Sequence, residues 1–284
     1  MTPTLVRRHL PQAGQSPRTE PGARARDWSE IQERMLVPLY EAVHERLEVG
    51  PATRLLGLGC GSGLALLMAA SRGAAVTGVE AVHPERLALA RQRLLPEGSG
   101  PRARRRVRLV ERPGDAADAT APPYTLVTAF EPLGGAAGDA ERVGGLLAAA
   151  TPMAARGAAV VLAGWGPPER CATSAVVRVA AGLADPPPGG GGWRPALRDG
   201  LEDVALRAGL RPDGSGRVAC PFGYASVDSA LKGLLSTGLF DAAVAATDEA
   251  RVEKEVTEAL HPYRRKDGTV WMPNVFRYLV ARVP

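Results

Sequence analysis

The sequence is poor in several residues that mark large classes of protein. Its three cysteines, Cys60, Cys171 and Cys220, are scattered along 284 residues, so they indicate neither a disulfide framework nor a zinc site. No apolar stretch approaches the ~20 residues that span a bilayer, and the N-terminus has no apolar signal region. We therefore expect a reduced, cytoplasmic location, no membrane contact and no metal.

Lysine and aromatic residues are also scarce. Only Lys232, Lys254 and Lys266 are lysines, so arginine supplies nearly all the positive charge of a chain with net charge +5. The one dense cluster, residues 102–108, has no aromatic residues between its arginines, so stacking on nucleic-acid bases is unsupported. We interpret it as a solvated approach to a strand and expect no nucleic-acid partner, although a basic face suits an acidic protein partner.

A glycine-rich stretch between Arg54 and Glu80 organises the rest of the chain. An apolar run leads into glycines at 57, 59, 61 and 63, a helix is predicted over 64–71, and a second apolar run ends at Glu80. Glycine permits positive φ and close approach of a ligand, and the helix that follows points free amides at it. An acid about 20 residues after the turn is typical of a ribose contact. The stretch predicts a nucleotide-type ligand, with a plain tight turn as the alternative.

Short apolar strands alternate with helical patterns along most of the chain. Strands are predicted over 53–58, 75–80, 107–110, 124–129, 158–163 and 276–283. Helices are predicted over 64–71, 84–94, 145–150, 197–208, 227–235 and 248–260. Such alternation implies parallel strands joined by right-handed crossovers. The predicted fold is therefore α/β, a doubly wound, mostly parallel, Rossmann-like sheet with extra helices at both ends.

Composition sets the domain boundaries. Residues 1–26 are rich in Pro, Arg, Gln and Gly without periodicity, which predicts a flexible arm. Residues 27–284 are predicted to form a single domain. Within it, the segment at 186–192 consists of three prolines, which are stiff, followed by four glycines, which are flexible, so we expect it to be mobile.

A helix is predicted from Asp27 to about Leu47, because apolar residues recur on one face. Asp27 is placed to cap it, with Glu30 completing a capping box. Pro38 lies inside the pattern and lacks a backbone N–H, so the helix should kink or split there. The apolar face is expected to pack on the sheet.

Two further acids fall where ligands bind in open parallel sheets, beyond the carboxyl ends of the strands. Asp115 follows the third predicted strand and Glu131 ends the fourth, so both are predicted near the glycines and near each other. Paired carboxylates suit a cationic amine, and a partly desolvated one can take its proton. An anionic leaving group would meet the glycine-loop amides. Asp115 as a turn cap and Glu131 as an ordinary loop acid are the plainer interpretations.

The remaining aromatic and histidine side chains give weaker indications of a functional site. For Tyr124, Tyr224 and Trp165, core or rim packing is the preferred interpretation and lining of the pocket is the alternative. The histidines do not cluster in the sequence, so no histidine base is expected; they are His9, His44, His83 and His261.

The run Gly59-Cys60-Gly61-Ser62-Gly63, followed by Glu80, resembles motif I of the class I S-adenosylmethionine methyltransferases, and the resemblance extends over residues 50–165. It implies that Gly59, Gly61 and Gly63 approach the cofactor and that Glu80 holds its ribose. It also implies that Asp115 meets the adenine while Glu131 faces the substrate. It further implies that the helix predicted from Asp27 lies over the cofactor cleft, in addition to or instead of packing on the sheet. The sequence departs from the family at Gly57, where an acid usually helps to order the methionine end of the cofactor.

The chain also resembles methyltransferase-fold aziridine cyclases of azinomycin-type antibiotic biosynthesis. This resemblance implies closure of a strained ring by amine displacement of a sulfate-type leaving group, with no cofactor required and with the glycines and Glu80 as vestiges of a cofactor site. It implies Asp115 and Glu131 as the catalytic pair, a small partner subunit in a heterodimer, and an acidic amino-group carrier protein that bears the substrate. Ring closure is our preferred prediction. A small-molecule methyltransferase using S-adenosylmethionine and a non-catalytic partner subunit are the alternatives.

Overall fold

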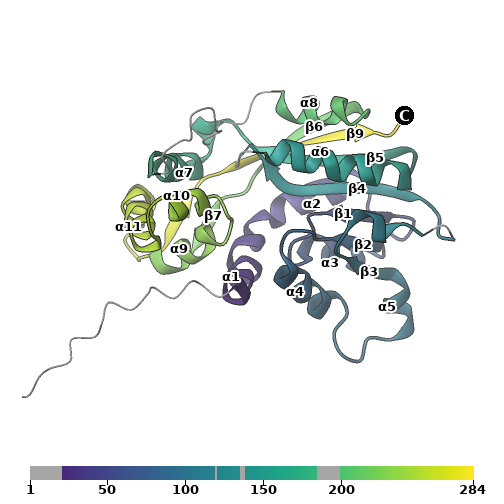
Figure 1. Cartoon of the computed structure of the whole chain (residues 1–284), viewed down its shortest axis with the longest axis horizontal. Helices are drawn as coiled ribbons and strands as arrows, with labels where there is room; N and C mark the ends of the chain where they lie inside the picture. Colours follow the sequence, from purple (N-terminus) through teal and green to yellow (C-terminus); the bar gives the residue numbers. More distant parts are fainter. Residues whose placement is uncertain (1–20, 119, 135–137, 184–198) are drawn as a thin grey trace, which may run out of the picture.

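The computed structural model describes residues 21–118, 120–134, 138–183 and 199–284. The expected mobile segment at 186–192 and most of the expected arm, residues 1–20, lie outside these ranges. The described chain forms a seven-stranded sheet with helices on both faces and a separate two-stranded sheet (Figure 1). The predicted α/β fold of doubly wound, mostly parallel type is confirmed.

The large sheet has the strand order β3-β2-β1-β4-β5-β9-β6, and β9 alone runs against its neighbours. Its strands are β1 (Arg54–Leu58), β2 (Ala75–Val79), β3 (Val107–Val110), β4 (Tyr124–Leu133), β5 (Ala154–Trp165), β6 (Arg211–Ala219) and β9 (Val275–Arg282). The small sheet pairs β7 (Phe222–Tyr224) with β8 (Val270–Met272). β4 and β5 are longer than predicted. β6 was not predicted, because its sequence contains Pro212, Gly214 and Gly216 and has no apolar alternation.

Six helices follow predicted patterns: α3 (Leu64–Ser71), α4 (Pro84–Leu94), α6 (Asp139–Ala150), α8 (Gly200–Arg207), α9 (Val227–Leu235) and α11 (Glu249–Leu260). Ser226 and Asp248 cap α9 and α11, since their side chains accept the N–H groups of Ser229 and Arg251. Further helices that were not predicted are α5 (Pro101–Arg106), α7 (Ala172–Leu183) and α10 (Asp241–Ala246). Short 3-10 turns are η3 (Pro113–Ala116), η4 (Thr151–Met153), η5 (Pro168–Arg170) and η6 (His261–Tyr263).

The N-terminal segment, residues 21–46, differs from the single helix predicted. It begins with α1 (Pro21–Asp27), so residues 21–26 of the expected arm are helical. It continues through a π-helical turn, η1 (Trp28–Gln32), and a 3-10 turn, η2 (Glu33–Leu36), into α2 (Val37–Arg46). The predicted capping box is wrong, because the chain is already helical at Asp27 and its side chain makes no capping bond. Pro38 lies in the first turn of α2, where the helix is split as predicted.

Two apolar cores lie on opposite faces of the large sheet. Side chains alternate along β1, so Leu55 joins one core while Leu56 and Leu58 join the other. The first core packs the sheet against α2 and α3, and the second packs it against α6 and α8. Because both faces are covered, the central strands read as continuous apolar runs rather than alternating ones.

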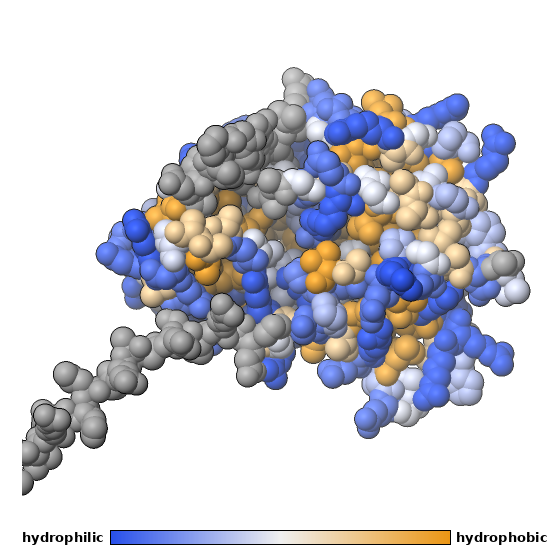
Figure 2. Space-filling model, viewed as in Figure 1, coloured by the Kyte–Doolittle hydropathy of each residue, from blue (hydrophilic) through white to orange (hydrophobic). Residues whose placement is uncertain are grey.

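Four helices, α7, α9, α10 and α11, gather with the small sheet at one end of the large sheet (left in Figure 1), and we call this group the helical cap. α1 contacts both α9 and α4, and η1 contacts α9 and, through Ser29 and Trp28, α4, so the N-terminal segment runs between the cap and the first half of the sheet. Hydrophilic side chains cover much of the face shown in Figure 2. In the described part of the chain, no helix is long and apolar enough to cross a membrane.

Candidate active site

The glycine loop, residues 59–63, joins β1 to α3 at the carboxyl edge of the sheet. Gly59, Gly61 and Gly63 have positive φ, between +56° and +81°, which is strained for a residue with a Cβ. A Cβ at Gly61 would also lie 3.1 Å from both Glu33 Oε1 and Trp28 Nε1. The close approach expected of a ligand is thus made here by the chain's own N-terminal segment.

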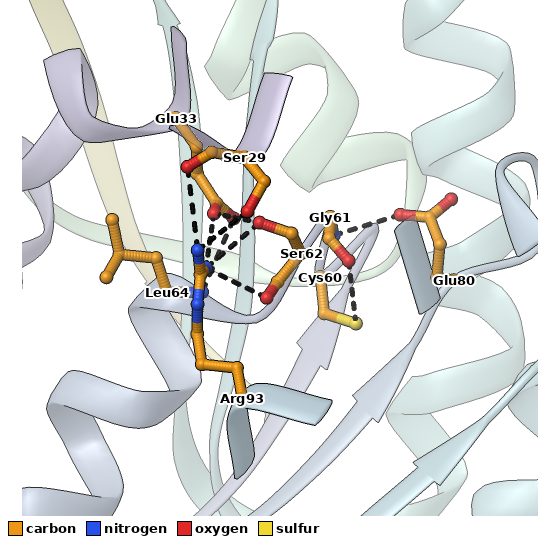
Figure 3. Close-up of polar contacts among 8 residues, drawn as sticks. All are labelled: Ser29, Glu33, Cys60, Gly61, Ser62, Leu64, Glu80 and Arg93. Atoms are coloured by element: carbon orange, nitrogen blue, oxygen red, sulfur yellow. Dashed lines mark hydrogen bonds and ion pairs between the residues drawn. The ribbon is translucent and has the colours of Figure 1, made fainter. Parts of the chain in front are cut away.

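The Glu33 carboxylate, on η2, lies at the start of α3 (Figure 3). It is buried, accepts hydrogen bonds from Arg93 Nη1 at 2.7 Å and from the Ser62 hydroxyl, and lies 3.4 Å from the Leu64 amide. Arg93 also donates to Ser62 Oγ at 2.9 Å and to Ser29 Oγ at 2.7 Å. A helix N-terminus is where an anion or a cofactor carboxylate binds. In this chain a protein carboxylate holds that place.

Glu80 follows β2 and points back at the glycine loop (Figure 3). Its Oε2 accepts a hydrogen bond from the Gly61 amide at 2.9 Å, and its Oε1 accepts from the Val82 and His83 amides at 3.2 Å each. Burial raises the pKa of this carboxyl above its ordinary value, and the Gly61 and Val82 hydrogen bonds work against that rise. Three backbone amides therefore hold this carboxylate in place, and Oε2, which accepts only one of them, keeps a lone pair for the ribose contact expected of Glu80.

Gly57, where the resembled family has an acid, packs against α3. A Cβ at this position would lie 2.9 Å from Leu66 Cδ2. A Cβ at Gly78, on the neighbouring strand, would lie 2.5 Å from Leu66 Cδ1. Leu66 therefore fills the space beside β1 and β2 that a side chain at position 57 would need, so the departure from the family has a packing reason.

Little space remains between the glycine loop and the N-terminal segment. The cavity there has a volume of about 30 Å³, which is room for about one water. Arg86 lines it, with its guanidinium 4.1 Å from the centre of the Trp28 ring and a 2.7 Å bond to the Ser236 carbonyl. Burial lowers the pKa of Arg86, and nearby Glu80 and Glu131 act in the opposite direction. Drug-sized ligands need roughly 300 Å³ or more, so S-adenosylmethionine does not fit these side chains as they are arranged.

A larger cavity of about 260 Å³, whose lining also includes Trp28, lies between the sheet edge and the helical cap. One wall is aromatic: the ring centroids of Trp165 and Phe276 are 4.6 Å apart, and Phe222 lies 6.1 Å from Trp165. Trp165 therefore lines a cavity instead of serving only as packing. The polar lining consists of Gln32, His83, Glu131, Asp139, Arg142, Thr237 and Asp241. An apolar wall with a few convergent polar groups is typical of a small-molecule site.

Glu131, near the end of β4, lines both cavities. Its Oε2 lies 3.4 Å from the position that a Cβ on Gly59 would take, so it stands beside the glycine loop as predicted. Arg142 binds both carboxylate oxygens, at 2.6 Å (Nη1–Oε2) and 3.3 Å (Nη2–Oε1). Burial works to lower the pKa of Arg142, but the hydrogen bond and charge of Glu131 outweigh it and raise the pKa. Each carboxylate oxygen keeps a lone pair, and the guanidinium keeps N–H donors, for a further ligand.

Asp139 and Asp241 are the further acids that line the cavity of Glu131. Asp139 is the one on the same helix as Arg142. It is the first residue of α6, one turn before Arg142, and its Oδ2 accepts the Gly134 amide at 2.7 Å. Sequence reasoning missed Asp139 and Arg142, because α6 was predicted only from residue 145. An acid directly after a glycine at a helix start was the signal that could have found them.

His83 also lines the larger cavity, although no histidine base was expected. Burial, followed by the charge of Arg86, lowers the pKa of His83 to about 4. Its imidazole is therefore neutral at neutral pH. Within the described ranges, no three His, Cys, Asp or Glu side chains are grouped as a metal site would require.

Asp115 reaches neither cavity. It lies in η3 after β3, where its half-exposed carboxylate pairs with Arg112 at 3.1 Å (Nε–Oδ2). The expected juxtaposition of Asp115 and Glu131 is therefore corrected. The short run from Arg112 to Asp115 closes a local ion pair that holds the acid at the surface, which strand order alone did not indicate.

The strand order, the glycine loop and the acid after β2 define the Rossmann-like fold of class I methyltransferases. No protein-family model and no curated protein sequence matches the chain. Its structure is similar to that of a putative methyltransferase from Bacillus halodurans (TM-score 0.53, 13% identity, covering 86% of this chain and 98% of that one). It is also similar to the [4+2]-cyclase SpnF (0.51, 16%, 87% and 80%) and to YjhP from E. coli (0.50, 20%, 92% and 99%). At these identities the likeness shows the fold alone.

Proposed function

We propose that this chain is an aziridine cyclase of azinomycin-type natural-product biosynthesis, built on a methyltransferase fold. It closes a strained ring by intramolecular attack of a substrate amine on carbon, with loss of a sulfate-type leaving group and without S-adenosylmethionine. One observation carries the proposal: two adjoining cavities of the same cleft differ in volume and in lining. A glycine-loop cavity of about 30 Å³ adjoins a charged, aromatic-walled cavity of about 260 Å³.

The substrate of such a reaction carries an ammonium and a sulfate on neighbouring carbons, and the Glu131–Arg142 pair offers the two matching charges. The ammonium would bind the remaining lone pairs of Glu131, and the sulfate the remaining N–H groups of Arg142. The Trp165 and Phe276 rings would cover the carbon skeleton. A ligand of one charge would leave one member of the ion pair unmatched, so the pair favours a zwitterion.

Glu131 is the proposed base. An ammonium with an ordinary pKa near 10 must lose a proton before its nitrogen can attack, and that proton passes to the Glu131 carboxylate. The nitrogen lone pair then forms the C–N bond while the C–O bond to sulfate breaks, and sulfate leaves with the bonding electrons. The ring nitrogen releases its second proton, for which Asp139 is the nearby acceptor in the same cavity. Holding both ends of the substrate supplies rate through orientation.

Arg142 replaces the glycine loop as the receptor for the leaving group. The sequence pointed to glycine-loop amides for this role, but the Gly61 amide already donates to Glu80 and the Leu64 amide faces Glu33. The Arg142 guanidinium points at the same cavity as the proposed base and can stabilise negative charge on the departing sulfate.

Two partners belong to the proposal. The net charge of +5 suits an acidic amino-group carrier protein that presents the substrate. A small partner subunit would form a heterodimer with this chain. Neither partner changes the chemistry assigned to Glu131 and Arg142.

Methyl transfer to a small molecule is the second candidate, because the three positive-φ glycines and Glu80 are all in place. It requires Trp28 and Glu33 to leave the glycine loop, since they fill the space that S-adenosylmethionine would take. A non-catalytic partner subunit is the least supported function, because it would have no use for the charged cavity around Glu131.

The test supplies the purified chain with a vicinal amino sulfate ester, both free and attached to an acidic carrier protein. Mass spectrometry follows ring formation and sulfate release, with and without S-adenosylmethionine. Ring closure in the absence of S-adenosylmethionine is expected. Tight binding of S-adenosylmethionine in calorimetry, together with methyl transfer and no ring closure, would establish the second candidate instead.

A further inference from the structure

A second set of charged residues lies at the amino edge of the large sheet, opposite to the candidate active site. A hollow of about 130 Å³ there is lined by Arg54 at the start of β1, Arg105 and Arg106 from α5, and Arg108 from β3. Strongly hydrophilic side chains project at the lower right of Figure 2, where Figure 1 shows α5. The fold thus adds Arg54, from far along the chain, to three members of the arginine run that the sequence suggested was only solvated.

The positive charge of this hollow is largely uncompensated. No carboxylate of the described residues lies within ion-pair distance of these four arginines, and Asp118 is the one acid in the lining. Arg106 donates to the Gly73 carbonyl, and Arg108 donates to the carbonyls of Asp115, Ala116 and Ala117. Neutral carbonyls fix the direction of these guanidinium groups without cancelling their charge.

Arg54 has a donor without a partner. Its Nε is buried and makes no hydrogen bond, while its guanidinium lies 5.6 Å from the centre of the Tyr124 ring. Tyr124 is itself fixed, since its hydroxyl lies 3.0 Å from both Thr77 Oγ1 and the Ala116 carbonyl. A buried donor without a partner is unfavourable, and an oxyanion in the hollow would supply the partner.

An apolar hollow of about 330 Å³ adjoins the arginine hollow. The two share Arg54, Asp118, Ala121 and Tyr124 in their linings. Beyond these, the second hollow is lined by Ala116, Ala117, Pro122, Pro123, Pro152 and Met153. One molecule with an anionic end and an apolar body would therefore contact both.

We propose that these adjoining hollows bind a small phosphate monoester, with its phosphoryl group among the arginines and its apolar body against the prolines and Met153. Arginine suits this group, because its planar fork matches phosphate oxygens. Four guanidinium groups and one acid favour a dianion over a singly charged carboxylate. The arginine hollow has roughly four times the ~30 Å³ share of one water, which fits one phosphoryl group and leaves the rest of the ligand to the adjoining hollow. The site is independent of ring closure, because it lies at the other edge of the sheet.

The test is calorimetry of the full chain at low ionic strength with inorganic phosphate and with phenyl phosphate. Both should bind, and phenyl phosphate should bind at least tenfold more tightly because only it reaches the apolar hollow. Arg105→Gln removes a lining arginine that makes no hydrogen bond in the described structure, and it should weaken both ligands about tenfold, which is 1.4 kcal/mol. Met153→Ser should weaken phenyl phosphate alone.

The matched control is Arg104→Gln, the same charge change on the neighbouring exposed residue of α5, which does not line the hollow. It should leave both affinities near wild type. Equal weakening by Arg104→Gln and Arg105→Gln would mean general charge attraction and would overturn the site. Equal affinity for phosphate and phenyl phosphate would overturn the apolar part, and absence of binding would overturn both. Ring-closure assays on Arg105→Gln should match wild type.

Discussion

The two halves of the cleft at the carboxyl edge of the sheet treat their charged groups in opposite ways. In the glycine-loop half, Glu33 is paired with Arg93, and Glu80 accepts three backbone amides, with a cavity of about 30 Å³ left over. In the other half, Glu131 and Arg142 form an ion pair in the lining of a cavity of about 260 Å³. Trp28, Leu36 and Glu131 line both cavities.

This difference shows how a chain can fill its own glycine loop with side chains from another segment. The positive φ angles of the loop glycines, the N-terminus of α3 and the acid after β2 are all present. The Glu33 carboxylate and the Trp28 indole, however, occupy the place where a ligand would bind. Buried groups that are already hydrogen-bonded gain little from a new ligand. The groups of the other half keep unused lone pairs and donors, so chemistry is expected there.

The largest expected effect tests whether the open half is the reacting half. Glu131→Gln keeps the shape of the side chain but removes the proposed base, so ring closure should fall ~10²–10⁴-fold. Asp115→Asn is the matched acid-to-amide control at a surface ion pair, and its rate should stay near wild type. Rates come from mass spectrometry and folding from thermal melting. A folded Glu131→Gln with the wild-type rate, or an inactive folded Asp115→Asn, would reverse the assignment.

The next effect tests whether the glycine-loop half is structural. Glu33→Gln leaves Arg93 without its buried ionic partner, and removing one member of a buried pair typically costs about 3–5 kcal/mol of stability. The control is Glu258→Gln, which breaks an exposed pair with Lys254 worth roughly 0–1 kcal/mol. Denaturant unfolding measures both. A Glu33→Gln protein as stable as Glu258→Gln would show that this half is not held together as described.

A smaller effect separates binding of the leaving group from the base. Arg142→Gln removes the charged donors assigned to sulfate, and a charge-assisted hydrogen bond of about 1.5–3 kcal/mol corresponds to roughly 10–100-fold in kcat/KM. Arg142→Lys keeps the charge without the fork and should recover part of the loss. Steady-state kinetics with sulfate and with a neutral leaving group on the same amine provide the measurement. Equal losses for both substrates would contradict a sulfate contact.

The open half was only partly predictable. Glu131 was found because a strand ends in an acid where parallel sheets bind ligands. Its partner Arg142 was not, because it lies on a helix whose start is marked only by a glycine and an acid. Asp115 had the same strand-end signal as Glu131, yet a neighbouring arginine holds it at the surface. Side-chain direction after a strand depends on such local partners, which strand order does not encode.

In the glycine-loop half, the backbone was predicted from the sequence, but the side chains that fill it were not. The turn, α3 and the position of Glu80 follow from glycine spacing and apolar runs. Glu33 carried no signal, because an acid within a helical pattern normally faces solvent. Its burial depends on Arg93 and Ser62, which are distant in sequence and meet it only in the folded chain.

The smallest expected effect concerns His83, the one imidazole in the lining of the open cavity. Burial lowers its pKa to about 4, so it stays neutral from about pH 5.5 to 8 and contributes no charge there. His83→Gln should therefore leave the rate within about threefold and the pH profile unchanged over that range. As the pH falls through about 4, an imidazolium would form beside Arg86 and oppose a cationic substrate, so the acid loss of rate should be shallower in His83→Gln. If instead the wild-type rate falls with an apparent pKa near 6.5 and that fall is absent in His83→Gln, His83 changes its protonation state during the reaction.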